Sequence, residues 1–141
     1  MKSSIVYYVN EEKGVCIAKL PTAMEELCRE FNNLATSFDS FDPVCFFEEW
    51  YCKYGKKMND LVGRAKCNIE DGDIFDVNFG KELAKNRLLT KINEYRTDAY
   101  SYVIERLDDM CDTMIHRMES NFRASVRAKQ RITEVINNNY N

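Results

Sequence analysis

Basic side chains are interleaved with aromatic ones along residues 64–95, the part of the chain whose residue types could act on a small ligand. The basic members are Arg64, Lys66, Lys81, Lys85, Arg87 and Lys91, and the interleaved rings are Phe75, Phe79 and Tyr95. Guanidinium and ammonium groups bind phosphate oxygens, and an aromatic ring offers a purine base a stacking surface. The pattern therefore fits a small nucleotide. Solvated lysines beside core aromatics are the alternative, and the residues alone favour that alternative.

The chain carries no recognisable catalytic constellation, and we expect a protein that is not an enzyme. It has neither a glycine-rich phosphate-binding loop nor a serine nucleophile elbow. The single histidine, His116, lies between Met114 and Met118 and is expected to be structural or exposed. The six cysteines form no closely spaced pair. We expect them to be reduced thiols that pack as small apolar side chains, with no metal and no cofactor.

Composition is typical of a folded soluble protein. Hydrophobic residues make up 45% and charged residues 30% of the 141 residues, which suits one domain with a real core. No apolar run approaches the roughly 20 residues that a membrane helix needs, and the N-terminal apolar segment is too short for a signal peptide. A net charge of -3 disfavours a nucleic acid polymer as the partner. We therefore expect a cytoplasmic protein without membrane contact.

A small antiparallel sheet packed by helices, an α+β fold, is expected in the first part of the chain. Residues 4–10 and 15–20 are rich in β-branched and aromatic residues, and with Gly14 in the connection they predict a hairpin. Residues 60–67 predict a third strand, with Leu61, Gly63, Ala65 and Cys67 on one face and Val62, Arg64 and Lys66 on the other. Within that strand, Gly63 would let a helix or a ligand approach the backbone closely.

Two helical segments precede the third strand. Thr22 and Glu25 have the spacing of a capping box and introduce an amphipathic helix over residues 23–36. After a loop at 37–43, the pattern of residues 44–54 is compatible with strand or helix. We expect a short helix there, with aromatic side chains that form a satellite core.

Residues 68–76 are expected to form an acidic turn around Gly72, and the polar residues at its end suit the beginning of a third helix. Asp76 or Asn78 is expected to cap a helix over residues 78–95. Thr97 or Asp98 is expected to cap a further helix after a bend.

This bend would divide the chain into an α+β domain, residues 1–96, and a long helical arm, residues 97–141. Apolar residues recur along the arm at helical spacing, at Val103, Leu107, Cys111, Met114, Met118, Phe122, Ile132 and Val135 or Ile136. At 1.5 Å per residue the arm would measure about 60 Å, whereas a compact domain of this size is about 40 Å wide. An uncovered apolar stripe needs a partner, so we expect the arm to assemble a homo-oligomer.

Charge is segregated along the arm. The first turns carry Glu105, Asp108, Asp109 and Asp112, and the later turns carry Arg117, Arg123, Arg127, Lys129 and Arg131. Two antiparallel copies, or one helix folded back on itself, would place these blocks against each other. A solvated face is the alternative.

Residues 60–96 also contain an ordered set of short motifs. In chain order they are Gly63–Cys67 (GRAKC), Asp73–Asp76 (DIFD), Phe79–Ala84 (FGKELA) and Arg87. This order resembles phage-encoded Thoeris anti-defense proteins, which act as sponges for cyclic ADP-ribose signals. The resemblance implies a small antiparallel sheet with long C-terminal helices, assembled as a dimer or hexamer, that sequesters the signal in the host cytoplasm without cleaving it. Residues 37–58 and the length of the arm depart from the family pattern.

The resemblance, taken with residue chemistry, implies a ligand pocket between protomers. The implied ligand-binding residues are Arg64 and Arg87 for the pyrophosphate, with Lys66 beside them, Phe75 or Phe79 for adenine, and Asn86 or Tyr95 for the ribose or base edges. The alternative is a phage inhibitor that acts by protein contact, like an anti-CRISPR protein, through the charged arm.

Overall fold

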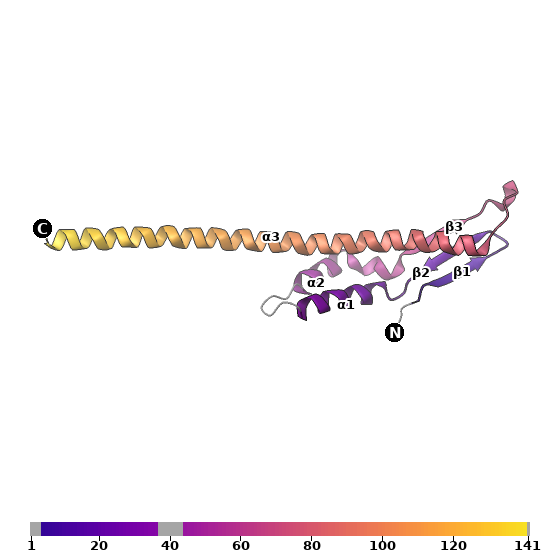
Figure 1. Cartoon of the computed structure of the whole chain (residues 1–141), viewed down its shortest axis with the longest axis horizontal. Coiled ribbons are helices and arrows are strands. Elements are labelled where there is room, and N and C mark those ends of the chain that lie inside the picture. Colours follow the sequence, from indigo (N-terminus) through magenta and orange to yellow (C-terminus); the bar gives the residue numbers. More distant parts are fainter. Residues whose placement is uncertain (1–3, 37–43, 141) are drawn as a thin grey trace. The chain divides into compact units, whose positions relative to one another are not determined.

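A computed structural model describes residues 4–36 and 44–140 and has an α+β architecture, as the sequence predicts. Its elements are β1 (Val6–Asn10), β2 (Val15–Lys19), α1 (Ala23–Thr36), α2 (Val44–Lys53), the 3-10 helix η1 (Gly55–Asp60), β3 (Val62–Lys66), the 3-10 helix η2 (Ile69–Asp71) and α3 (Val77–Tyr140) (Figure 1). The strands form one antiparallel sheet in the order β1-β2-β3. The loop expected at 37–43 lies outside the described residues. No helix in the described ranges is long and apolar enough to cross a membrane.

Two compact units make up the chain, Met1–Val103 and Ile104–Asn141. Helix α3 passes through the boundary between them without interruption. The expected bend and new cap at Thr97 or Asp98 are therefore wrong, and so is a helix folded back on itself. Assignment of residues 1–96 and 97–141 to separate domains, and of the arm to oligomerisation, remains a prediction.

The β1–β2 hairpin forms where the glycine predicts it. Gly14 has a φ of 58°, in the left-handed region, and its N–H donates a 3.2 Å hydrogen bond to the carbonyl oxygen of Glu11. The hairpin turn is also bonded to the segment that follows β3, because the Cys67 N–H donates to the Gly14 carbonyl oxygen at 2.7 Å. This bond places the hairpin turn beside the C-terminal end of β3.

Helix α3 packs directly on one face of the sheet. In β3, Gly63 and Ala65 are buried while Arg64 and Lys66 are exposed, which confirms the predicted alternation. A Cβ added at Gly63 would lie 1.9 Å from the carbonyl oxygen of Ala84 in α3. The glycine therefore admits a helix and not a ligand, and Figure 1 shows the first part of α3 running along the sheet.

The N-terminus of α1 is capped from a distant segment. Helix α1 has the predicted bounds, but its Met24 N–H donates a 2.8 Å hydrogen bond to Oδ1 of Asn59 in η1. The hydroxyl of Thr22 is buried and has no hydrogen-bond partner among the described residues. The capping box expected from Thr22 and Glu25 is therefore wrong, because the side chain of Asn59 supplies the cap.

An aromatic cluster joins α1, α2 and the first unit's part of α3. The ring of Phe31 stacks on Phe47 at a centroid distance of 4.4 Å and on Tyr100 at 4.7 Å. Trp50 is fully buried, and its Nε1–H donates a 2.8 Å hydrogen bond to Oδ2 of Asp98. The short helix expected in residues 44–54 is thus confirmed, and the satellite core is confirmed for Phe47 and Trp50, whereas Tyr51 and Tyr54 are exposed.

Candidate functional site

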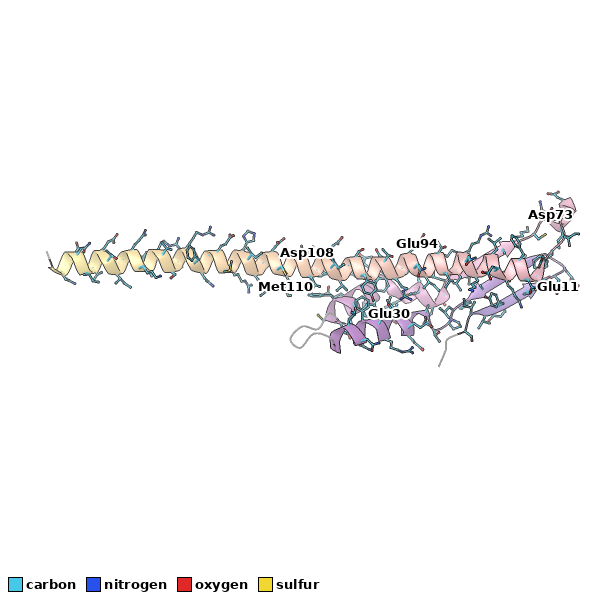
Figure 2. The ribbon with its side chains drawn as sticks, in the orientation of Figure 1. Glu11, Glu30, Asp73, Glu94, Asp108 and Met110 are labelled. Carbon is cyan, nitrogen blue, oxygen red and sulfur yellow. The ribbon has the colours of Figure 1, made fainter. Side chains whose placement is uncertain are left out.

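Two adjoining pockets lie around the C-terminal end of β3. Both are lined by the same three residues, Lys66, Cys67 and Asn68. The chain then turns through η2 and reaches Gly72, whose φ of 88° suits the left-handed cap of that short helix. Figure 2 shows Glu11 of the hairpin turn and Asp73 of this loop at the same end of the unit. The pockets therefore lie where the hairpin turn, the end of β3 and the loop before α3 come together.

The first of these, the aromatic pocket, has a volume of about 380 Å³ and is lined by Phe75 and Phe79. Phe79 is 68% exposed, so its ring is open to a ligand. Phe75 is half-buried, and its ring lies close to the backbone at Gly80, where an added Cβ would be 3.1 Å from Cε2. The carboxylates of Asp73 and Asp76 also line this pocket. It thus offers a stacking surface together with acceptors for an amino group.

The second, the basic pocket, has a volume of about 380 Å³ and carries an excess of positive charge. Its charged lining residues are Lys13, Arg64 and Lys66 on the basic side and Glu12 and Glu70 on the acidic side. Alternation along β3 points the side chains of Arg64 and Lys66 away from α3. The basic pocket is therefore the better place for an anion.

Helix α3 begins at its predicted cap, and this limits what its N-terminus can bind. Oδ1 of Asp76 accepts hydrogen bonds from the N–H of Asn78 at 2.9 Å and from that of Phe79 at 3.1 Å. The Gly80 N–H donates to the Asp76 carbonyl oxygen at 2.9 Å. These donors are occupied and a carboxylate lies among them, so a phosphate group would meet the side chains of the basic pocket instead.

Basic side chains of α3 lie along the free edge of β3. Nη1 of Arg87 donates a 2.7 Å hydrogen bond to the carbonyl oxygen of Arg64, and Nζ of Lys91 donates at 2.7 Å to that of Val62. These bonds satisfy carbonyl groups that an edge strand would otherwise leave to solvent. The guanidinium of Arg87 thus contacts the strand backbone, and Arg87 lines neither pocket.

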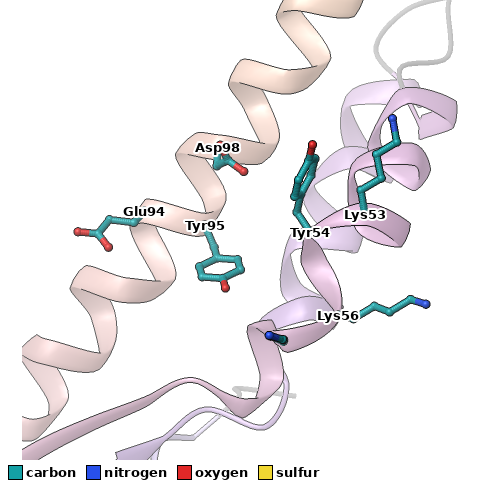
Figure 3. Close-up of a pocket in the computed structure, with 7 residues that line it drawn as sticks. Lys53, Tyr54, Lys56, Glu94, Tyr95 and Asp98 are labelled. Atoms are coloured by element: carbon teal, nitrogen blue, oxygen red, sulfur yellow. The ribbon is translucent and has the colours of Figure 1, made fainter.

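The remaining predicted residues lie elsewhere in the unit. Asn86 is exposed on α3, and its carbonyl oxygen accepts a hydrogen bond from Oγ1 of Thr90. Tyr95 lines a different pocket, of about 560 Å³, whose other residues include Tyr54 and Lys56 (Figure 3). The structure therefore brings Arg64, Lys66, Phe75 and Phe79 together and leaves Asn86, Arg87 and Tyr95 outside that group.

Sequence reasoning missed Lys13, which lies in the hairpin turn. The register of the sheet pairs Val15 with Lys66, so the residues just before β2 must approach the end of β3. The backbone N–H of Lys13 also donates a 3.0 Å hydrogen bond to Oδ1 of Asn10, which orders the turn. Extending the predicted pairing of β2 with β3 past Val15 and Lys66 would have placed Lys13 opposite Asn68, at the end of β3.

No disulfide joins any of the six cysteines, which all lie within the described residues, and their reduced state stays a prediction. Burial raises the pKa of the Cys16 thiol, with Lys81 as a smaller opposing influence, and burial also raises the pKa of Cys28. Both therefore stay protonated at neutral pH and behave as core side chains. Cys111, expected to pack on the apolar stripe, is exposed in the single chain. Within the described residues, no three His, Cys, Asp or Glu side chains are grouped so that they could hold a metal ion.

Comparison of the chain with protein-family models, with curated proteins and with solved structures finds no match. The function proposed below therefore rests on the chemistry of the two pockets and on the motif resemblance.

Proposed function

We propose that this protein captures an anionic, nucleotide-derived immune signal of the cyclic ADP-ribose type and sequesters it without cleavage. The observation that carries the proposal is the adjacency of an aromatic and a basic pocket that share Lys66. An adenine nucleotide needs the same two features, a stacking surface and cations for its phosphates. With the motif resemblance, this chemistry favours an anti-defense protein of a phage that acts in the host cytoplasm.

Each part of such a ligand has a counterpart in the two pockets. The pyrophosphate would lie in the basic pocket, against Arg64, Lys66 and Lys13. The adenine would stack on the exposed ring of Phe79, with its exocyclic amino group toward the carboxylate of Asp73. The acidic residues of the aromatic pocket then help to orient the ligand, because they favour the base and repel the phosphates.

Sequestration requires tight binding, and this is why we include a second protomer in the proposal. Holding a signal at micromolar concentration requires a binding free energy of about -8 kcal/mol. A dimer or hexamer that covers the pockets would exclude water from the charged contacts and strengthen them. In this arrangement residues 104–140, which carry a row of exposed large apolar side chains in the single chain, serve assembly.

The experiment that tests capture is to purify the protein from cells that produce cyclic ADP-ribose signals, denature it, and measure the mass of any released small molecule. An intact cyclic signal, in an amount comparable to the protein, is the expected result. Release of a linear hydrolysis product would contradict sequestration without cleavage. Protein that releases nothing, although the cells contain the signal, would contradict capture itself.

A second candidate function is inhibition by protein contact, and the exposed apolar and charged surface of residues 104–140 favours it. The two candidates differ in which variant loses activity against host defence. Arg64→Ala should abolish activity if the protein captures a ligand. If Arg64→Ala stays fully active while Met118→Lys in the second unit is inactive, contact through the arm is the better account.

A further inference from the structure

Residues 104–140, the second unit's part of α3, carry a row of large apolar side chains that nothing covers in the single chain. Its members are Ile104, Met110, Met114, Ile115, Met118, Phe122, Val126, Ile132, Val135 and Ile136. Phe122 is 70% exposed and Met118 is 63% exposed. Water disfavours a row of this size on a helix, so a partner with a matching apolar face is needed.

Seven of the ten members of the row are arranged symmetrically about Met118; Ile115, Val135 and Ile136 have no counterpart. Met114 and Phe122 each lie four residues from Met118, and Met110 and Val126 each lie eight residues from it. Ile104 and Ile132 each lie fourteen residues away. Three pairs of apolar positions spaced equally about one residue suit contact with a copy of the same segment running the opposite way, because a two-fold axis pairs position i with j and j with i.

The net charge has opposite sign on the two sides of Met118. Residues 104–118 carry four acidic and two basic side chains, whereas residues 119–140 carry two acidic and four basic ones. Packed helices lie about 8–10 Å apart, comparable to the screening length of about 8 Å at physiological ionic strength. An antiparallel pair would therefore place acidic turns beside basic turns, whereas a parallel pair in register would place Asp108, Asp109 and Asp112 beside their own copies.

We propose that residues 104–140 pair antiparallel with the same segment of a second copy of this chain, with Met118 on the two-fold axis. Met114 then opposes Phe122 of the partner subunit, a thioether against an aromatic ring, which is a favourable contact. The occupant is a second copy because the charge pattern complements itself, and because α3 is continuous to Tyr140 and does not fold back within one chain. This inference is independent of ligand capture, since it uses no residue of the pockets.

Disulfide trapping distinguishes the two orientations. The native Cys111 is exposed and lies seven residues before Met118, and Ser125 lies seven residues after it, so an antiparallel pair sets these positions opposite each other. The full-length Ser125→Cys variant, treated with oxidised glutathione and mapped by mass spectrometry of its peptides, should yield a disulfide between Cys111 and position 125 of two chains. A disulfide between the two copies of Cys111 in the unsubstituted protein would overturn the proposal, because the proposed pair sets these two residues fourteen positions, or about 21 Å, apart along the helices.

A charge placed on the axis gives an independent test. Met118→Lys puts two ammonium groups together at the two-fold axis and should weaken dimerisation about tenfold or more, measured by sedimentation or light scattering over a range of concentrations. His116→Lys is the matched control, because it adds the same charge to an exposed position two residues away, toward the opposite side of the helix. Equal effects of the two substitutions, or an unsubstituted protein that is monomeric throughout, would overturn the proposed pairing.

Discussion

The guanidinium of Arg87 in α3 donates a 2.7 Å hydrogen bond to the carbonyl oxygen of Arg64 in β3. Two arginines that look equivalent in the sequence therefore have different surroundings. The guanidinium of Arg87 is hydrogen-bonded along the free edge of the sheet, and that of Arg64 lines the basic pocket. The bond also holds the backbone of Arg64 in place. Arg87 therefore affects the basic pocket only indirectly, through the position of Arg64.

Substitution of each arginine should separate binding from stability. Arg64→Ala should weaken binding of cyclic ADP-ribose at least about tenfold, because a hydrogen bond to a charged group contributes about 1.5–3 kcal/mol. Its unfolding free energy should change little, since the side chain is exposed. Arg87→Ala should instead lower the unfolding free energy by about 0.5–1.5 kcal/mol. Urea titration and binding measurements on both variants check this, and loss of affinity in Arg87→Ala at unchanged stability would show that its guanidinium reaches the ligand.

Close contact between β3 and α3 predicts a large cost for any side chain at Gly63. Gly63→Ala would bring a Cβ within 1.9 Å of the Ala84 carbonyl oxygen, and the helix would have to move. We expect the unfolding free energy to fall by about 3 kcal/mol, as in an overpacked core.

Gly80→Ala is the control for this substitution. Its added Cβ would meet the edge of the Phe75 ring at 3.1 Å, a side chain that can shift, and alanine favours the helix. Its unfolding free energy should stay within about 1 kcal/mol of the parent value. Equal stability of the two variants would contradict the direct packing of α3 on β3.

Alkaline pH should weaken the first unit through Tyr100. Its hydroxyl donates a 3.0 Å hydrogen bond to Oε2 of Glu30, which also pairs with Arg96. Burial, followed by this bond to a carboxylate, raises the pKa of Tyr100 above its ordinary value of 10.0. A pKa that folding raises stabilises the protein fully below the unfolded pKa, and this contribution disappears as the pH rises through the folded pKa.

The unfolding free energy should therefore decline above about pH 10. Tyr100→Phe should lower it by about 0.5–1.5 kcal/mol at neutral pH and should show a smaller decline above pH 10. Tyr8→Phe, at an exposed position of β1, is the control for the ionisation of other tyrosines. A steeper alkaline decline in Tyr100→Phe than in the parent protein would contradict the assignment.

Local patterns predicted the elements well, since short-range chemistry decides them. Gly14 marked the hairpin and Asp76 marked the start of α3, and both act through backbone geometry within a few residues. The predicted break at Thr97 or Asp98 failed because the carboxylate of Asp98 accepts from Trp50, 48 residues earlier. No local pattern reports such a contact.

The candidate site could be predicted only in part for the same reason. Lys66 and Phe79 lie in the pockets because Lys66 ends β3 and Phe79 lies in the first turn of α3, positions that the sequence indicates. Lys13 was missed because its approach depends on how β2 pairs with β3. The environment of Arg87 was missed because it depends on which edge of the sheet is free.

Titration calorimetry of the full chain with cyclic ADP-ribose isomers tests the central claim most directly. We expect saturable binding of at least one isomer with a Kd of about 1 µM or lower, which corresponds to about -8 kcal/mol. Lys66→Ala, which alters both pockets, should abolish the heat, while Lys129→Ala, which removes the same charge from the second unit, should leave it unchanged. No heat from any isomer, with roughly tens of micromolar of protein shown to be folded, would contradict the account.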